Sequence, residues 1–581
     1  MKGRHAIKFG ADISYQLATQ RAPINNRGAF TYAQSSVNGT IVPAVITSMA
    51  NFIDDVAGPS GTYTKYFATG RYHPNLFLPS FYAEDIFKVT PNLTVNFGVR
   101  YENFGQPANI FKYPAYSGLY GKANDQVKAH QSNFNFGPSI GFAYTPAWLN
   151  HNTVIRGGYS ITYDTFYNNL LSNIAAAAPN ALTNTTVTST SSSNTPRGYV
   201  GLSNVAATAT AVAIYPYTSI SNIFNQGIRN PYYNHISLGI QQEMPGKVVM
   251  DLSYVGTLGR QLFFTNYVNP ILPNAAYTSY ATQSTSYGTQ YTRLNAARGS
   301  IASRESGLTS NYNSLQVSIT RKPFNTAAGS FYTTGNCNWS KNMDVLSDPF
   351  ATYSSGAYTS KSITQYGSIK KYDNGPSDLD RRHVAKVILH WDVRGLESHK
   401  LLNRAVGGWS LTPVLTVMSG SPYNVFNGTD RDLDGVSAND RPNIGNINAP
   451  ANTRGVITTA CSTGYYDPNV SSIPANACVS ASSVRWVQAP TYQPLSSTMA
   501  SRNSVTMDRY LNLDLNVAKN IPINDRIKVQ LRSEFFNFTN TQSYDTSQFA
   551  TSVSSTANTF MNNSSISGGA RSFRVSGKII F

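Results

Sequence analysis

The sequence predicts an all-β protein, an antiparallel β-barrel that spans a membrane, and three observations lead to this fold class. Only 13% of the residues are charged and 12% are aromatic, whereas soluble domains carry about 25% charged residues. The mean hydropathy is −0.27, and the absence of any apolar run of about 18 residues excludes a helical membrane protein. Finally, apolar and polar residues alternate along many segments, as expected where one face meets lipid and the other meets water.

The alternation is clearest in three segments. In Leu93–Glu102 the residues Leu93, Val95, Phe97, Val99 and Tyr101 share one face, and the same pattern recurs in "YLNLDLNVAK" and "RIKVQLRSEFFNF". The opposite faces are too polar for a dry core, because each unpaired polar group would cost about 1 to 3 kcal/mol. These faces therefore fit a wet lumen.

Reading this pattern through all 581 residues predicts roughly sixteen strands and a single barrel domain over residues 1–581. Besides the three segments above and the terminal strand, they are expected at Ile7–Gln16, Ala29–Gln34, Tyr63–Ala68, Leu78–Lys88, Phe134–Tyr144, Val154–Tyr163, His235–Gln242, Val248–Val255, Ser314–Arg321, Ser330–Trp339, His383–Trp391 and Trp409–Val417.

From Leu78 onward the connections alternate between short and long. The short ones include "VTPN", "MPGK" and "NIPIND", while Phe166–Asn234 and Ser419–Asp508 are long and polar. Short periplasmic turns and long extracellular loops are typical of outer-membrane barrels. The count of strands then places Phe581 at the periplasmic rim.

The chain ends on an alternating ladder, "RSFRVSGKIIF". Phe573, Val575 and Ile579 are expected to face lipid, with Phe581 at the membrane rim, where aromatic residues are favoured.

The sequence contains three cysteines, which are too few for a disulfide scaffold and lack the spacing of a metal site. Cys461 and Cys478 flank a polar stretch and are candidates for one disulfide in an oxidising compartment, the alternative being two unpaired thiols.

The net charge of +17 does not indicate nucleic-acid binding, because the basic residues are scattered and no nucleic-acid motif is present. Contact with the phosphates of lipid head groups is the better interpretation.

Asp430, Asp432 and Asp434 occupy alternate positions before Gly435, like the first half of a calcium loop. Arg441 stands where the bidentate Glu of such a loop is expected. The alternative is a loop whose carboxylates are satisfied by Arg431 and Arg441.

No pattern indicates an enzyme. "DLDRRH" (Asp378–His383) fits an ion-paired strand entry, and no phosphate loop, nucleophile elbow or zinc-protease motif occurs. We therefore expect no catalytic activity and no cofactor other than the calcium considered above. The amino terminus, "MKGRHAIKFG", lacks the apolar segment of a signal peptide.

Several segments together resemble the barrel of the TonB-dependent transporters, and specifically the Oar-like subgroup. The matching runs cover most of the chain and include "FYAEDIFKVTPNLTVNFGVRYE", "NTVIRGGYSITYD", "DRRHVAKVILHWD", "GGWSLTPVLTVMSGSPYNV" and "VQLRSEFFNFTNT".

The resemblance implies a 22-stranded outer-membrane barrel with a plug domain and signal peptide that this chain lacks, so the chain is expected to be truncated and not transport-competent alone. It further implies uptake of a large ligand such as a siderophore or oligosaccharide. The implied partners are outer-membrane lipid and lipopolysaccharide, the TonB energy-coupling complex acting through the plug, and the barrel-assembly machinery, which reads Phe573, Val575, Ile579 and Phe581. The alternative is a surface adhesin that uses the barrel to display long loops.

Overall fold

The structure is a computed structural model of the 581-residue chain. It describes residues 3–21, 29–32, 48–53, 62–68, 71–72, 75–105, 134–149, 152–165, 181–186, 222–224, 228–267, 271–272, 292–293, 302–347, 358–359, 373–395, 400–429, 431, 440–490, 498–524, 526–544, 551–555, 560–561 and 569–581.

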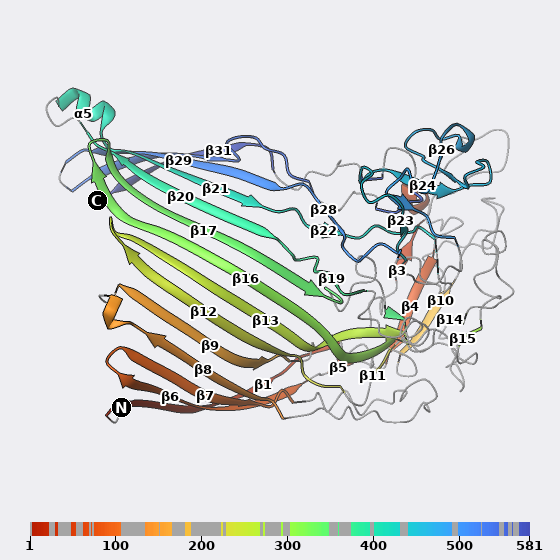
Figure 1. Ribbon diagram of the computed structural model, residues 1–581, viewed down its shortest axis with the longest axis horizontal. Coiled ribbons are helices and arrows are strands. Elements are labelled where there is room, and N and C mark those ends of the chain that lie inside the picture. The colour runs from red at the N-terminus through yellow and green to blue at the C-terminus, as the bar shows by residue number, and fades with distance from the viewer. Residues whose placement is uncertain are drawn as a thin grey trace.

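One large curved sheet dominates the molecule (Figure 1). Its long strands are β1 (His5–Gln16), β6 (Leu76–Thr90), β7 (Leu93–Glu102), β8 (Phe136–Tyr144), β9 (Thr153–Tyr163), β12 (Tyr232–Met244), β13 (Val248–Tyr267), β16 (Ala302–Thr326), β17 (Gly329–Asp344), β20 (His383–Val393), β21 (Trp409–Met418), β29 (Tyr510–Pro522), β30 (Lys528–Phe536) and β31 (Ser572–Ile580). Each pairs antiparallel with the next in this order. The all-β, antiparallel prediction is therefore confirmed.

The sheet is open between its first and last strands. Within the described residues, β1 pairs along its length only with β6, and β31 only with β30. The short strands β11 (Asn222–Phe224), β18 (Tyr358–Thr359) and β19 (Gly375–Pro376) bring the sheet to 17 strands.

The two rims of the sheet differ as the sequence predicted. The turns β6–β7, β12–β13 and β16–β17 are short and lie at one rim, together with both chain ends and the helix α5 (Lys400–Val406). The long connections all leave from the opposite rim (Figure 1). Phe581 therefore ends at the short-turn rim, as expected.

The pairing register separates an apolar face from a polar face. Leu415 lies opposite Val387 on one side and Leu513 on the other, so these three side chains share a face. Their neighbours Thr416, Lys386 and Asn512 form a matching row on the other face. Val387 is 42% exposed, which is costly in water but not in lipid.

Aromatic rings border the apolar face at both rims. On β17, Phe331 stacks on Trp391 at 5.5 Å near the short-turn rim, and Trp339 stacks on His383 at 6.3 Å nearer the other rim. Eight residues separate Phe331 from Trp339, which is about 27 Å along a strand and roughly 20 Å across the membrane at a usual tilt. That distance matches an apolar band of about 25 Å between aromatic girdles.

Two of the expected strands are not part of the large sheet. β3 (Ala29–Thr31) and β4 (Thr62–Ala68) belong to a separate sheet beyond the long-loop rim, in which β4 pairs with β3 on one side and with β10 (Ala181–Thr186) on the other. Alternation alone could not distinguish them, because a small surface sheet also has two unlike faces.

The remaining elements are short and belong mainly to the long connections. They are α1 (Ser48–Ile53), the 3-10 turns Ala147–Leu149 and Pro474–Asn476, β2 (Gln20–Arg21), β5 (Arg71–Tyr72), β14 (Ile271–Leu272), β15 (Thr292–Arg293), β22 (Pro422–Tyr423), β23 (Asn443–Ile444), β24 (Arg454–Ile457), β25 (Tyr465–Tyr466), β26 (Cys478–Val479), β27 (Trp486–Val487) and β28 (Val505–Thr506). In the described part of the chain, no helix has the length and apolar character needed to cross a bilayer.

The two faces make a direct prediction. Leu415→Arg should lower the free energy of unfolding in lipid by about 2 to 4 kcal/mol, because it places a cation at mid-depth in hydrocarbon. Val414→Arg adds the same side chain to the polar face opposite Asp514 and should cost far less. Urea titration of the protein folded in lipid vesicles measures both, and equal losses would contradict the assignment of the faces.

Candidate functional site

The polar face carries a hollow on the wall formed by β6 to β9 and β12. Its volume is about 640 Å³, and the polar side chains that line it include Glu84, Asn96, Ser139, Ser160 and His235. The hollow exists because small residues occupy successive positions of the polar face. A methyl group on Gly141 would come within 2.5 Å of the Asn96 side chain, so even alanine is crowded there.

Ion pairs and hydrogen bonds tie the polar face together across strands. Arg100 on β7 donates to Ser80 on β6 at 2.8 Å, Arg574 on β31 donates to Glu534 on β30 at 2.7 Å, and Arg156 on β9 reaches across β12 to pair with Asp251 on β13. Long side chains on neighbouring strands therefore hold one another in place. The surface so formed is hydrophilic and charged, and it suits contact with a polar ligand.

Part of the longest connection, Ser419–Asp508, is a folded unit that we call the cap. The cap comprises the described residues 421–429, 431, 440–490 and 498–508, with 551–555 and 560–561 from a later connection. Its main sheet has the order β23, β27, β24, β25, β26, and it lies beyond the long-loop rim (Figure 1).

The cap has its own hydrophobic core, in which Val425, Trp486 and Val553 are almost fully buried. Burial also raises the pKa of the Tyr423 hydroxyl well above its usual range, with the charge of Asp508 adding to the effect. The core shows that this segment folds as a soluble domain does, in contrast to the barrel.

Buried arginines anchor the cap to the barrel. Arg502, which is fully buried, donates to the Asp344 carboxylate at 2.5 Å and to its backbone oxygen at 3.0 Å, where β17 ends. A third bond from Arg502 reaches Ser347 at 2.7 Å. Arg441 reaches Asp373 in the same way, at 2.8 Å. The cap is therefore fixed to the β17 end of the sheet.

A third arginine closes the cap on itself. Arg454 is fully buried and donates to the backbone oxygen of Val553 at 2.9 Å and to Ser555 at 3.0 Å. Its guanidinium also lies 4.7 Å from the centre of the Phe560 ring. Desolvation by this burial lowers the pKa of Arg454, while nearby Asp467 opposes the shift. The contacts join two connections that are about a hundred residues apart in sequence.

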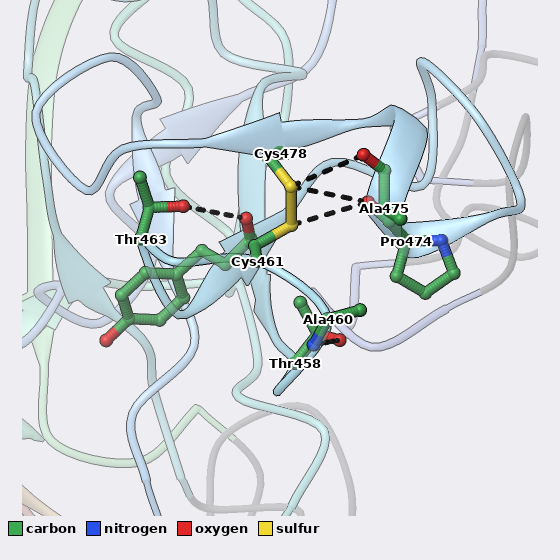
Figure 2. Close-up of a disulfide and its surroundings, with 8 residues drawn as sticks. Thr458, Ala460, Cys461, Thr463, Pro474, Ala475 and Cys478 are labelled. Atoms are coloured by element: carbon green, nitrogen blue, oxygen red, sulfur yellow. Dashed lines mark hydrogen bonds between the residues drawn. A yellow bond between two sulfur atoms is a disulfide. The ribbon is translucent and has the colours of Figure 1, made fainter.

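Cys461 and Cys478 form a disulfide inside the cap, with 5.5 Å between their Cα atoms (Figure 2). The turn between them folds back on the bond, so that the Pro474 carbonyl oxygen lies 3.4 Å from the Cys461 Sγ. Cys337, in contrast, is a free and exposed thiol on β17.

The three aspartates considered for calcium, Asp430, Asp432 and Asp434, lie outside the described residues. Arg441, proposed as their partner, binds Asp373 and the Ala500 backbone oxygen, and Arg431 donates to the Arg441 backbone oxygen. Among the residues the structure describes, no group of three metal-binding side chains occurs.

The terminal ladder lies at the open edge of the sheet. Phe573 and Val575 lie opposite Phe535 and Ser533, on the apolar face, and Ile579 lies opposite Val529. Phe581 follows the end of β31 and is 94% exposed. The ladder therefore has the two faces that the sequence predicted.

Sequence reasoning missed the cap, which was expected only as a long polar loop. One signal was present in "SVRWVQAP", a short apolar run around Trp486 in an otherwise polar segment. The anchoring arginines could not be found this way, because 158 residues separate Arg502 from Asp344.

Comparison with known proteins agrees with the architecture. Residues 1–574 match the family described as outer membrane beta barrel domain. Similar solved structures include the outer membrane transporter YddB from Escherichia coli (12% identity, TM-score 0.49, covering 100% of this chain and 52% of that one) and a mutant ferric enterobactin receptor, PfeA, from Pseudomonas aeruginosa (11%, 0.45, 99% and 51%). The chain thus spans about half the length of these proteins. No curated protein sequence matches it.

The anchor at Arg502 can be tested directly. Arg502→Met should destabilise the docked cap by about 3 to 5 kcal/mol, because it leaves the Asp344 carboxylate buried without its cation. Hydrogen exchange of cap amides measures the loss. Asp344→Asn in the same chain should restore part of the protection, and Arg526→Met, in an exposed short turn, serves as control. Unchanged exchange in Arg502→Met would contradict the anchor.

The disulfide gives a second prediction. Replacing both Cys461 and Cys478 with Ser should lower the stability of the cap by about 3 kcal/mol, because the bond closes a loop of this length in the unfolded chain. Protease resistance of the cap reports the change, and Cys337→Ser is the matched control. If reductant leaves the wild-type cap as resistant as before, the bond does not stabilise it.

Proposed function

Because the chain belongs to the outer membrane beta barrel domain family, we propose that it is the barrel portion of a TonB-dependent importer in the outer membrane. The observation that carries the proposal is the continuous polar inner face, with its hollow of about 640 Å³ between strands whose other face is apolar. A passage for a large polar ligand needs a hydrophilic wall, and the hollow gives such a ligand room at this wall.

The partners follow from the same proposal. The plug and the segment pulled by the energy-coupling complex would belong to a part of the protein outside these 581 residues. The coverage of only 52% of the Escherichia coli transporter supports a longer parent protein. The resemblance of the sequence to TonB-dependent transporters supports a siderophore, an oligosaccharide or a similar large ligand. Lipopolysaccharide would surround the barrel, and the assembly machinery would read the terminal ladder.

The second candidate is a surface adhesin, favoured by the cap. This unit is folded, disulfide-bonded and anchored to the barrel, and among its described residues it exposes the apolar side chains of Ile447, Val470 and Ile473 at 53%, 69% and 57%. A rigid display element of this kind suits contact with another surface.

One experiment separates the two functions. Cells lacking the gene should fail to grow on at least one member of a panel of ferric siderophores and oligosaccharides supplied as sole iron or carbon source. A protonophore should abolish uptake in wild-type cells. If growth is unaffected but attachment to surfaces is lost, the adhesin is correct and the importer is not.

A pair of variants connects the test to the hollow. Ser160→Trp, expressed in the full-length parent protein, fills the hollow and should reduce uptake toward the level of the deletion strain. Ile161→Trp adds the same ring to the opposite face near Asn234, where the aromatic girdle nearer the long-loop rim tolerates it. Equal uptake by the two variants would show that the ligand does not pass this wall.

A further inference from the structure

The outward face of β13, β16, β17 and β20 changes from apolar to basic just beyond the aromatic girdle that lies nearer the long-loop rim. Along β17 the outward positions run Phe331, Thr333, Gly335, Cys337, Trp339 and Lys341. The cation thus comes directly after the girdle tryptophan, on the side of the long loops. In a bilayer this is the level at which hydrocarbon gives way to head groups.

Two further cations lie at this level or above it. Arg260 continues the outward row of β13, and its Nη1 donates to the backbone oxygens of Gly259 and Ser310 and to the Asn311 side chain at 3.1 Å. His383 lies opposite Trp339, and Arg381 comes two residues before His383 in the chain. The hydrogen bond from the Ser340 amide to the Arg382 backbone oxygen continues the strand pairing past His383. Alternation therefore places Arg381 outward.

None of the three cations is neutralised by a carboxylate within the described chain. The Lys341 side chain is exposed and makes no hydrogen bond or ion pair to a described residue. Arg381 donates only to the backbone oxygens of Asp378 and Asp380. Arg260 likewise binds backbone oxygens and an amide.

The nearby carboxylates are engaged elsewhere. Arg502 of the cap pairs with both Asp344 and Asp378, and the Asn503 side chain of the cap donates to Asp378. Asp380 pairs with Arg382 at 3.3 Å and accepts the Asn342 amide at 2.7 Å. These three carboxylates are thus engaged by groups other than Arg260, Lys341 and Arg381.

We propose that Arg260, Lys341 and Arg381 form a binding site for a phosphorylated glycolipid head group in the outer leaflet. The site rests on the proposed membrane orientation and deepens the proposed contact with lipopolysaccharide by naming its residues. Three strand spacings separate β13 from β20, and Arg260 lies four residues beyond Gly256, the β13 residue level with Lys341. The backbones of the three cations therefore span about 20 Å. That width suits a head group with more than one phosphate, while Asn311 and Asn313 between them offer amides to its sugars.

To test the proposal, the affinity of the full chain for lipid A is measured by thermophoresis, with the protein folded in neutral detergent. The triple variant R260Q/K341Q/R381Q should bind lipid A roughly 100-fold more weakly, and Lys341→Gln alone about fivefold more weakly, given the usual contribution of one basic residue. Lys386→Gln removes an exposed cation from the lumen face of the neighbouring strand and should bind as wild type does.

Two further binding measurements use the wild-type protein and so do not depend on the folding of the triple variant. Wild-type protein should bind lipid A stripped of its phosphates as weakly as the triple variant binds the intact lipid. Millimolar inorganic phosphate should not displace lipid A, and displacement would reveal a free-phosphate site instead. Equal binding of both lipids, or an equal loss in Lys386→Gln, would overturn the proposal. Because no uptake is measured, these results are independent of the importer test.

Discussion

The contact of one sheet with two different solvents is the constraint on which the rest of the structure depends. Backbone groups in hydrocarbon must be paired within the protein, and an antiparallel ladder satisfies them on both sides of each inner strand. Once the ladder is fixed, side chains alternate between lipid and water, so each strand carries two chemistries. The outward row of Val387, Leu415 and Leu513 and the inward row of Lys386, Thr416 and Asn512 express the same pairing.

Beyond the membrane this constraint is lifted, and the chain folds by different rules. The cap buries Trp486 and Val553 in one hydrophobic core, as a soluble domain would. It also buries complete charges, at Arg454 and Arg502, which is tolerable only because each guanidinium meets several acceptors. The same chain therefore uses hydrocarbon to stabilise the barrel and desolvated ion pairs to fix the cap.

The anchoring of the cap links the two regions and has consequences for both. Arg502 holds the cap at the end of β17, whereas the hollow lies on the wall formed by β6 to β9 and β12. A ligand approaching the hollow would thus meet the cap as a fixed neighbour rather than as a loose loop. One anchor therefore fixes where the cap stands relative to the inner face.

The sequence by itself determined the two-faced strands, the asymmetry of the rims and the end of the chain at the short-turn rim. These follow from local alternation, because a lipid face and a water face select residues one position apart. It underestimated β13 and β16, which continue to Tyr267 and begin at Ala302, because strand pairing persists above the membrane after lipid stops selecting apolar residues. Only the tertiary structure decided the cap, its arginine anchors and the hollow. Each joins residues far apart in the chain, and no local pattern records which distant carboxylate an arginine will meet.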